Sequence, residues 1–332
     1  MLPRRYPKIH IRSKAELARH LSDVRMSRNA VLRLINDCLD NFDKYWTDHP
    51  IYSEPKKDKW VRDASRTNLG KLLKLIDAKV LKPQDKELPN FIFGGVSKLN
   101  HKAAVQHLLG RRRKRVLLKL DISRFFEQNR DDRVFNLFKY KFECGEDGSK
   151  LLTKLCCVPF GRKDEPSNYQ TIARGFPTSP RLSVWCNLDA FIKIDRLIKK
   201  ELKGKDPRLA IYVDDIGVTA SKVTKEDMMR LYPKIRSILE SDEHHKLPLN
   251  DAKTKIIYHS GETFDIEGGY QGKFCFEHLG TQMNRNSLMP GTKSRWKLVG
   301  TVEKYKASKG TDKTLKTKRK AMLGYKAYIR RK

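Results

Sequence analysis

The sequence of 332 residues contains no run of about 18 apolar residues, so no membrane-spanning helix is expected. Its opening residues, MLPRRYPKIHIRSK, lack the apolar stretch of a secretory signal. Cysteine is scarce, and no two cysteines form a CxxC pair; the six are Cys38, Cys144, Cys156, Cys157, Cys186 and Cys275. We therefore expect a cytoplasmic protein with reduced thiols and no membrane contact, without a disulfide framework or a structural zinc site.

Acidic residues are few relative to basic ones. The chain has 71 Lys and Arg residues against 39 Asp and Glu residues, which gives a formal net charge of +32. Such an excess predicts a polyanionic partner. Basic residues are concentrated in residues 56–86, 111–115 and 293–332, and the last stretch has fifteen of them against two acidic residues. Any one stretch can be a solvated face or a flexible tail, but three in one chain favour a continuous basic channel.

Hydrophobic periodicity predicts an α+β core. Residues 116–121 alternate as a strand, with Leu117, Lys119 and Asp121 on one face. The other expected elements are helices capped by Asp131 or Asp132, by Ser179 and by Thr224, and strands at 209–213, 216–220 and 256–258. Only Asp214 and Asp215 separate the first two of these strands, which indicates a tight hairpin. The order of elements predicts an antiparallel sheet with helices on one face.

Asp121, Asp214 and Asp215 are the leading candidates for chemistry. A pair of aspartates at a hairpin tip is by itself most often a solvated turn. Asp121, however, ends its own strand, and if the two strands are adjacent the three carboxylates meet at one end of the sheet. Such carboxylates repel one another unless cations share them, and magnesium is bound by one or two carboxylates together with substrate phosphates. The pattern is typical of two-metal phosphoryl transfer.

Residues 174–180, RGFPTSP, lie between these acids in the sequence. Gly175 removes a side chain where a backbone must approach a flat surface, such as a base pair. The helix that follows offers its N-terminus to a phosphate or a sugar. An ordinary junction between a loop and a helix has the same pattern.

Five segments, in this order, resemble the motifs of reverse transcriptases. They are residues 121–126 (DISRFF, motif A), 175–180 (GFPTSP, motif B), 212–215 (YVDD, motif C), 250–254 (NDAKT, motif D) and 278–280 (HLG, the end of motif E). They span about half of the chain. The chain resembles bacterial retron-type enzymes or the related defence-associated, abortive-infection-like group. It departs from them at Ala103, where retron enzymes have Asn before the Ala-x-x-His motif, at residues 279–281, which replace a Val-Thr-Gly signature, and at Arg174, which replaces the usual Gln.

The resemblance implies catalytic and substrate-binding roles for the matched residues. Asp121, Asp214 and Asp215 match the metal-binding carboxylates, which the backbone of Ile122 is expected to join. Lys253 matches a lysine that assists the leaving pyrophosphate, with a surface lysine as the alternative. The expected substrate-binding residues are Phe126, which would exclude a ribose hydroxyl, and Arg174, Gly175, Ser179 and Tyr212. Phe125 is expected in the core, and Arg174 is expected to hold a phosphate or the template backbone.

The basic stretches supply the expected nucleic-acid-binding residues, which are Arg111, Arg112, Arg113, Lys316, Lys318, Arg319 and Lys320. Trp296, Leu298 and Val299 interrupt the C-terminal charges at spacings that allow amphipathic helices.

The resemblance also implies a right-hand polymerase. Residues 1–115 would form the fingers, 116–272 the palm with a fingers insertion near 140–170, and 273–332 a small basic thumb, with no RNase H domain expected after motif E. Two Mg²⁺ ions, with Mn²⁺ as a substitute, are the expected cofactors. The expected partners are a noncoding RNA template, an RNA–DNA hybrid, dNTPs and an accessory effector protein.

The implied function is RNA-directed DNA synthesis in anti-phage defence. A template-independent or protein-primed polymerase and a catalytically silent RNA-binding subunit remain the alternatives.

Overall fold

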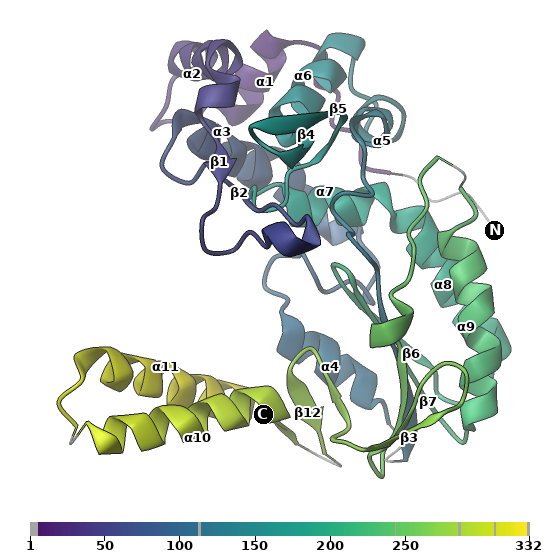
Figure 1. The fold of residues 1–332 in the computed structure, drawn as a ribbon. Coiled ribbons are helices and arrows are strands. Elements are labelled where there is room, and N and C mark those ends of the chain that lie inside the picture. Colours follow the sequence, from purple (N-terminus) through teal and green to yellow (C-terminus); the bar gives the residue numbers. More distant parts are fainter. Residues whose placement is uncertain (1–5, 112–113, 243, 285–286, 309, 331–332) are drawn as a thin grey trace.

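A six-stranded antiparallel sheet stands at the centre of the computed structural model, which describes residues 6–111, 114–242, 244–284, 287–308 and 310–330. Its strand order is β10-β9-β8-β3-β7-β6. The bounds are Arg115–Asp121 for β3, Arg208–Tyr212 for β6, Asp215–Ser221 for β7, Lys255–Tyr258 for β8, Glu262–Phe264 for β9 and Tyr270–Lys273 for β10. A helical lobe lies at one end of the sheet and a pair of helices projects from the other (Figure 1). The predicted α+β class with an antiparallel sheet is confirmed.

The central strand β3 has the alternation that its sequence predicts. Val116, Leu118 and Leu120 face the main core, where α8 (Leu188–Glu201) and α9 (Lys225–Leu239) cover the sheet (Figure 1). Leu117 belongs to a second, smaller core on the other face. Burial on both faces explains why four of the five residues 116–120 are apolar.

The second face of the sheet is also covered, so the expectation of helices on one face only is wrong. Helix α4 (His101–Leu109) packs there through Val105 and Leu108, whose spacing gives the helix an apolar stripe that must be buried. A three-stranded sheet completes the cover; its strands are β11 (Glu277–His278), β12 (Thr281–Met283) and β13 (Leu288–Pro290).

The helical lobe is formed by residues before α4 and by residues between β3 and α7. Its elements are α1 (Lys14–Leu21), α2 (Arg28–Asp40), α3 (Asn68–Ile76), α5 (Asp131–Asn136), α6 (Glu146–Cys156), the pair β1 (Thr47–Asp48) and β2 (Arg62–Asp63), and the hairpin β4 (Cys157–Arg162) and β5 (Glu165–Ile172). Helix α7 (Ser179–Cys186), which is almost entirely buried, joins the lobe to α8.

Two helix starts differ from the sequence prediction. Helix α5 has Arg130 at its N-cap and no side-chain cap, while Asp131 and Asp132 lie in its first turn, where their charge favours the helix dipole. Ser179 is the first residue of α7 rather than its cap, and its hydroxyl donates to the carbonyl of Ala173 at 2.6 Å. The prediction for α9 is confirmed, since Thr224 and Asp227 form a reciprocal capping box.

The C-terminal residues form two helices, α10 (Thr292–Ala307) and α11 (Lys313–Arg330), which we call the arm. They pack against each other and project away from the sheet (Figure 1). Within these two described helices Ile329 is the one buried residue, and it joins the smaller core. The Lys102 ammonium donates to the carbonyl of Tyr328 at 3.0 Å, which fixes the base of the arm to α4.

None of the helices in the described ranges is long and apolar enough to cross a membrane.

Candidate active site

The register of the central strands brings the three predicted aspartates together. Asp121 on β3 lies opposite Asp215 on β7, and Asp214 directly precedes Asp215 in the hairpin turn. The N–H of Ile122 donates to the carbonyl of Asp214 at 2.9 Å, which ties the end of β3 to the turn. Tyr212 already pairs with Asp215, so the two connecting residues are Val213 and Asp214, one residue earlier than the sequence predicted.

The hairpin turn has an unusual backbone. Val213 has a φ of 60°, although its β-branched side chain disfavours the left-handed region. A two-residue hairpin needs a positive φ at its first connecting residue to match the twist of its strands. The N–H groups of Phe93 and Gly94 both donate to the carbonyl of Ile211, at 2.8 and 3.2 Å, so the chain at 93–94 lies directly against the turn. A Cβ on Gly94 would lie 2.7 Å from Cγ2 of Val213, so glycine is required for this approach.

Mutual repulsion and burial perturb the carboxylates. Burial raises the pKa of Asp215 to about 6, and the neighbouring charge of Asp214 adds to the shift. Burial also raises the pKa of Asp214, and the charge of Asp121 acts in the same direction. Added positive charge at this end of the sheet would therefore stabilise the ionised carboxylates.

Lys253 supplies positive charge to the site. Its Nζ lies 3.0 Å from each carboxylate oxygen of Asp121. It ends a short 3₁₀ helix, Asp251–Lys253, which Asn250 caps by accepting the N–H of Lys253. The N–H of Asn250 donates to the carbonyl of Asp121 at 2.8 Å, so motif D is bonded directly to motif A.

The three aspartate carboxylates suit a hard divalent cation, but they do not form a complete coordination shell by themselves. Carboxylate oxygens are the ligands that magnesium prefers, and magnesium usually completes its shell with water and substrate phosphates. Among the described residues, no group of three or more His, Cys, Asp or Glu side chains is arranged to hold a metal ion. Asp121, Asp214 and Asp215 thus fit an ion that arrives with its substrate. Binding of that ion to Asp121 would require Lys253 to release the Asp121 carboxylate.

The residues around Phe126 form the other side of the site. Phe125 is buried, as expected, whereas Phe126 is half-buried at the surface of the site. Arg174 lies over the Phe126 ring, with Cζ 4.9 Å from the centroid. Two of its nitrogens, Nε and Nη2, each donate to a carboxylate oxygen of Glu127 at 2.8 Å. Glu127 thus takes two of the donors of Arg174, and the role expected of Arg174 toward a phosphate or the template backbone stays a prediction.

Glu127 is a residue of this site that the sequence analysis missed. Its position directly after Phe126 is the one signal that could have singled it out.

Gly175 and Ser179 hold the loop before α7. Gly175 has a φ of 105°, and a Cβ there would overlap the carbonyl oxygen of Arg62. The close approach of β2 therefore already requires glycine at this position, and the expected approach to a base pair stays a prediction. The N–H of Arg62 donates to the carbonyl of Arg174 at 2.6 Å, which joins this loop to the helical lobe.

Tyr212 packs between the site and the arm. It is half-buried against the smaller core, which also contains Phe93 and contacts Tyr325. Burial raises the pKa of its phenol, and the proximity of Tyr328 adds to the shift. The base of the arm therefore lies close to motif C.

The predicted nucleic-acid-binding residues are not gathered in one place. Arg111 lies just before β3, at the opposite end of this seven-residue strand from Asp121, roughly 20 Å away, and its N–H donates to Asp206. Arg112 and Arg113 lie outside the described residues. On α11, Lys316, Lys318 and Lys320 are exposed, whereas Arg319 lies over the Tyr305 ring at 4.9 Å.

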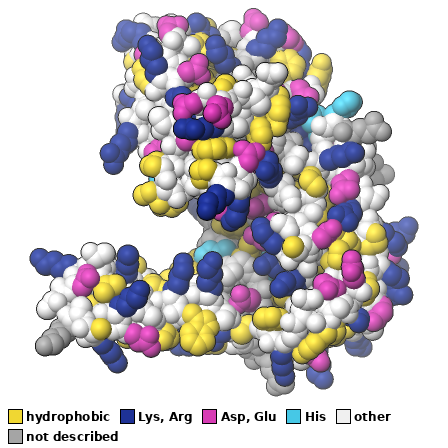
Figure 2. Space-filling model, viewed as in Figure 1, with side chains coloured by type: hydrophobic (Ala, Val, Ile, Leu, Met, Phe, Trp, Pro, Cys, Tyr) yellow, Lys and Arg dark blue, Asp and Glu magenta, His cyan; other side chains and the backbone are white. Residues whose placement is uncertain are grey.

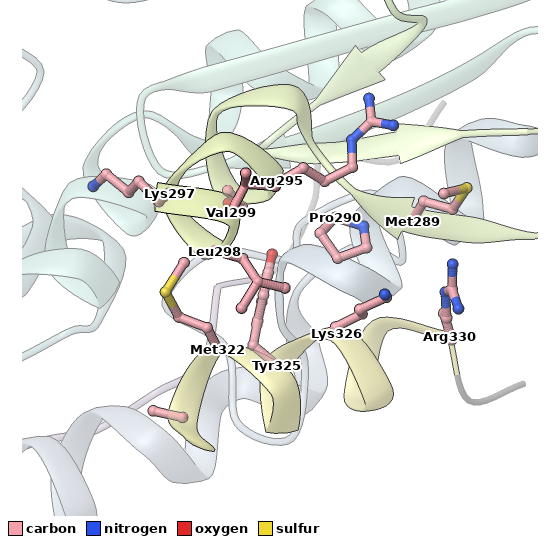
Figure 3. Close-up of a pocket in the computed structure, with 12 residues that line it drawn as sticks. Met289, Pro290, Arg295, Lys297, Leu298, Val299, Met322, Tyr325, Lys326 and Arg330 are labelled. Atoms are coloured by element: carbon pink, nitrogen blue, oxygen red, sulfur yellow. The ribbon is translucent and has the colours of Figure 1, made fainter. Parts of the chain in front are cut away.

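The molecule is hollowed between the helical lobe and the arm, and Lys and Arg side chains lie on both borders of the hollow (Figure 2). A separate apolar pocket of about 440 Å³ lies between the arm and β13, and Pro290, Leu298, Met322 and Tyr325 are among the residues that line it (Figure 3). None of the motif residues lines this pocket.

Comparison with known proteins supports the resemblance read from the motifs. No family model matches the chain. The chain is 25% identical over 206 residues to the Retron Ec48 reverse transcriptase of Escherichia coli; the match covers 59% of this chain and 46% of that protein, so the chain spans less than half of its relative's length. A structure of telomerase from Candida albicans, in complex with a TWJ fragment of telomeric RNA, matches 54% of this chain and 31% of its own at 11% identity and a TM-score of 0.36. The predicted resemblance to retron-type reverse transcriptases is confirmed by the first of these matches.

Proposed function

We propose that the protein is an RNA-directed DNA polymerase of the retron type, which extends DNA from dNTPs on a dedicated noncoding RNA. The observation that carries this proposal is the pairing of Asp121 with Asp215, with Asp214 in the adjoining turn. The similarity to a retron reverse transcriptase supports it.

Asp121, Asp214, Asp215 and the carbonyl of Ile122 would hold two Mg²⁺ ions, or Mn²⁺ in their place. When bound, these ions supply activation of the primer 3′-hydroxyl and stabilisation of charge on the transferred phosphoryl group. Lys253 is already within 3.0 Å of Asp121, so its ammonium would lie within reach of the leaving pyrophosphate and could donate a proton to it.

The remaining site residues would orient the substrate. Phe126 would place its ring against the sugar and exclude a 2′-hydroxyl, while Gly175 and Ser179 shape the loop that faces the nucleotide. Tyr212 would lie beneath the primer terminus. Arg174 would act through its contact with Phe126, and its remaining donors would face a phosphate or the template backbone.

We assign residues 1–115 to fingers, 116–272 to a palm with a fingers insertion near 140–170, and 273–332 to a basic thumb. Helix α4 is an exception within the first part, since it packs on the sheet. An RNA–DNA hybrid would lie in the hollow between the helical lobe and the arm, whose borders carry Lys and Arg side chains (Figure 2). The exposed lysines of α11, which include Lys316, Lys318 and Lys320, would contribute contacts to its phosphates. A cytoplasmic role in anti-phage defence, with an accessory effector protein, is part of this proposal.

The test is primer extension by the purified chain, with and without RNA template, in the presence of magnesium. We expect synthesis that depends on RNA and is lost in Asp214→Asn, while RNA affinity is retained. Asp195→Asn, which removes an aspartate paired with Lys199 on α8, is the matched control and should extend normally. Extension without RNA would favour the template-independent alternative, and binding without any extension would favour a silent RNA-binding subunit.

A further inference from the structure

Glu127 and Arg174 form a bidentate ion pair beside the candidate active site. Both partners are largely buried, with 18% of the Arg174 side chain and 11% of the Glu127 side chain exposed. The two parallel 2.8 Å bonds match the planar guanidinium to the planar carboxylate. Solvent screens such a pair far less than an exposed one, so it fixes the guanidinium in one orientation.

The guanidinium in turn covers the ring of Phe126. Arg174 lies over one side of the ring at 4.9 Å, and the Phe125 ring meets it edge-on at 6.0 Å and 61°. Glu127 is the residue that follows Phe126 in the chain. The ion pair therefore links the cation that covers the Phe126 ring to the residue that directly follows Phe126 in the chain.

Both ends of this clamp are anchored to buried backbone. Asn129, which is fully buried, donates its N–H to the carbonyl of Phe126 at 3.1 Å and its side-chain amide to that of Phe125 at 2.6 Å. At the other end, the carbonyl of Arg174 accepts the N–H of Arg62. With the backbone held, the side chain of Glu127 determines where the guanidinium sits.

From this geometry we propose that Glu127 is a positioning residue for sugar selection: through Arg174 it holds the ring of Phe126 where the ring excludes a ribonucleotide. The inference rests on the proposed polymerase function and adds a residue to it. The guanidinium of Arg174 already interacts electrostatically with Asp214. Without the Glu127 carboxylate, the guanidinium would move toward Asp214 and would no longer cover the Phe126 ring.

The experiment measures single-nucleotide incorporation by the full-length chain on a primed RNA template, with dNTP and rNTP compared. Glu127→Gln keeps the shape of the side chain and removes its charge. We expect the preference for dNTP to fall by about fivefold, which is the factor expected from loss of one cation–π contact. An unchanged preference in Glu127→Gln overturns the inference.

A double-mutant cycle with Phe126→Ala separates positioning from a general structural role. If Glu127 acts through the ring, adding Glu127→Gln to Phe126→Ala leaves the dNTP preference where Phe126→Ala alone puts it. A further drop in the double variant means that Glu127 acts independently of the ring, and refutes the proposal.

Asp58→Asn is the matched control. It breaks the nearby ion pair between Asp58 and Arg124 without touching Phe126, so the dNTP preference should not change. If Glu127→Gln does not fold, Arg174→Lys repeats the test, because it keeps the positive charge and loses the fork. A wild-type chain that incorporates no dNTP on any primed RNA overturns the polymerase function itself, and with it this inference.

Discussion

Replacing Gly94 by alanine should lower the rate of DNA synthesis, although Gly94 itself lies outside the candidate active site. An added Cβ would lie 2.7 Å from the carbonyl carbon of Tyr212 and from Cγ2 of Val213, and closer still to the nitrogen of Val213. Carbon atoms pack comfortably at about 3.5–4.0 Å, so the turn must retreat by roughly 1 Å. Because Asp214 directly follows Val213, its carboxylate would move with the turn.

Two magnitudes follow from this displacement. Overpacking of this kind costs about 1–3 kcal/mol of stability. A misplacement of about 1 Å at a reacting centre lowers the rate by on the order of 10²-fold. We therefore expect Gly94→Ala to fold, with a lowered unfolding free energy, and to extend primers about a hundredfold more slowly at saturating dNTP.

The assays are single-nucleotide extension and urea unfolding of the same preparation. Gly300→Ala is the matched control, because a Cβ at this position in α10 meets no atom within 4 Å. It should raise stability by roughly 0.5–1 kcal/mol through helix propensity. A Gly94→Ala protein that extends primers at the wild-type rate would refute the argument that the turn requires glycine beneath it.

Three further outcomes are expected. Because the pKa of Asp215 is raised to about 6, the folded state of the metal-free protein holds this proton more tightly than the unfolded state, so stability should fall as pH rises from about 4 to 6 and then level off. In urea unfolding with a chelator present, the free energy of unfolding of Asp215→Asn should not show this decrease between about pH 4 and 6, which is at most about 3 kcal/mol. Lys253→Met should slow nucleotide addition by on the order of 10²-fold in single-turnover assays, through loss of the proton donor, whereas an unchanged rate would leave Lys253 a surface lysine. Changing Lys316, Lys318 and Lys320 together to Gln should flatten the slope of log affinity against log salt by roughly 0.9 for each lost phosphate contact; parallel slopes would remove α11 from the nucleic-acid surface.

The strands and the acidic site were predictable because their signals are local. The alternation in 116–121 specifies the faces of β3, and the Tyr-Val-Asp-Asp segment between two apolar runs specifies a hairpin. The exact turn was not predictable, since a positive φ at Val213 contradicts its own preference and depends on Gly94 from another part of the chain. Tertiary context overrode the local rule there.

The remaining misses have the same origin. Ser179 and Asp131 are residues that commonly cap helices, yet each lies inside the helix, since the carbonyl of Ala173 captures the Ser179 hydroxyl and Arg130 takes the cap position of α5. The partnership of Glu127 with Arg174 joins residues 47 positions apart, and no periodicity in a single sequence reports such a contact.

The sparse burial of the arm has a consequence for its motions. Ile329 is the one buried residue of α10 and α11, and beyond it the partly buried Tyr325 packs on the smaller core, so few apolar contacts oppose separation of these helices from the sheet. Segments with few buried apolar contacts open as independent cooperative units, without global unfolding. Amide hydrogens in 292–307 and 313–330 should therefore exchange with solvent well before those of β3 and β7. A duplex that binds the arm would slow this exchange. The residence time of nucleic acid on the protein would therefore be coupled to the local folding of α10 and α11.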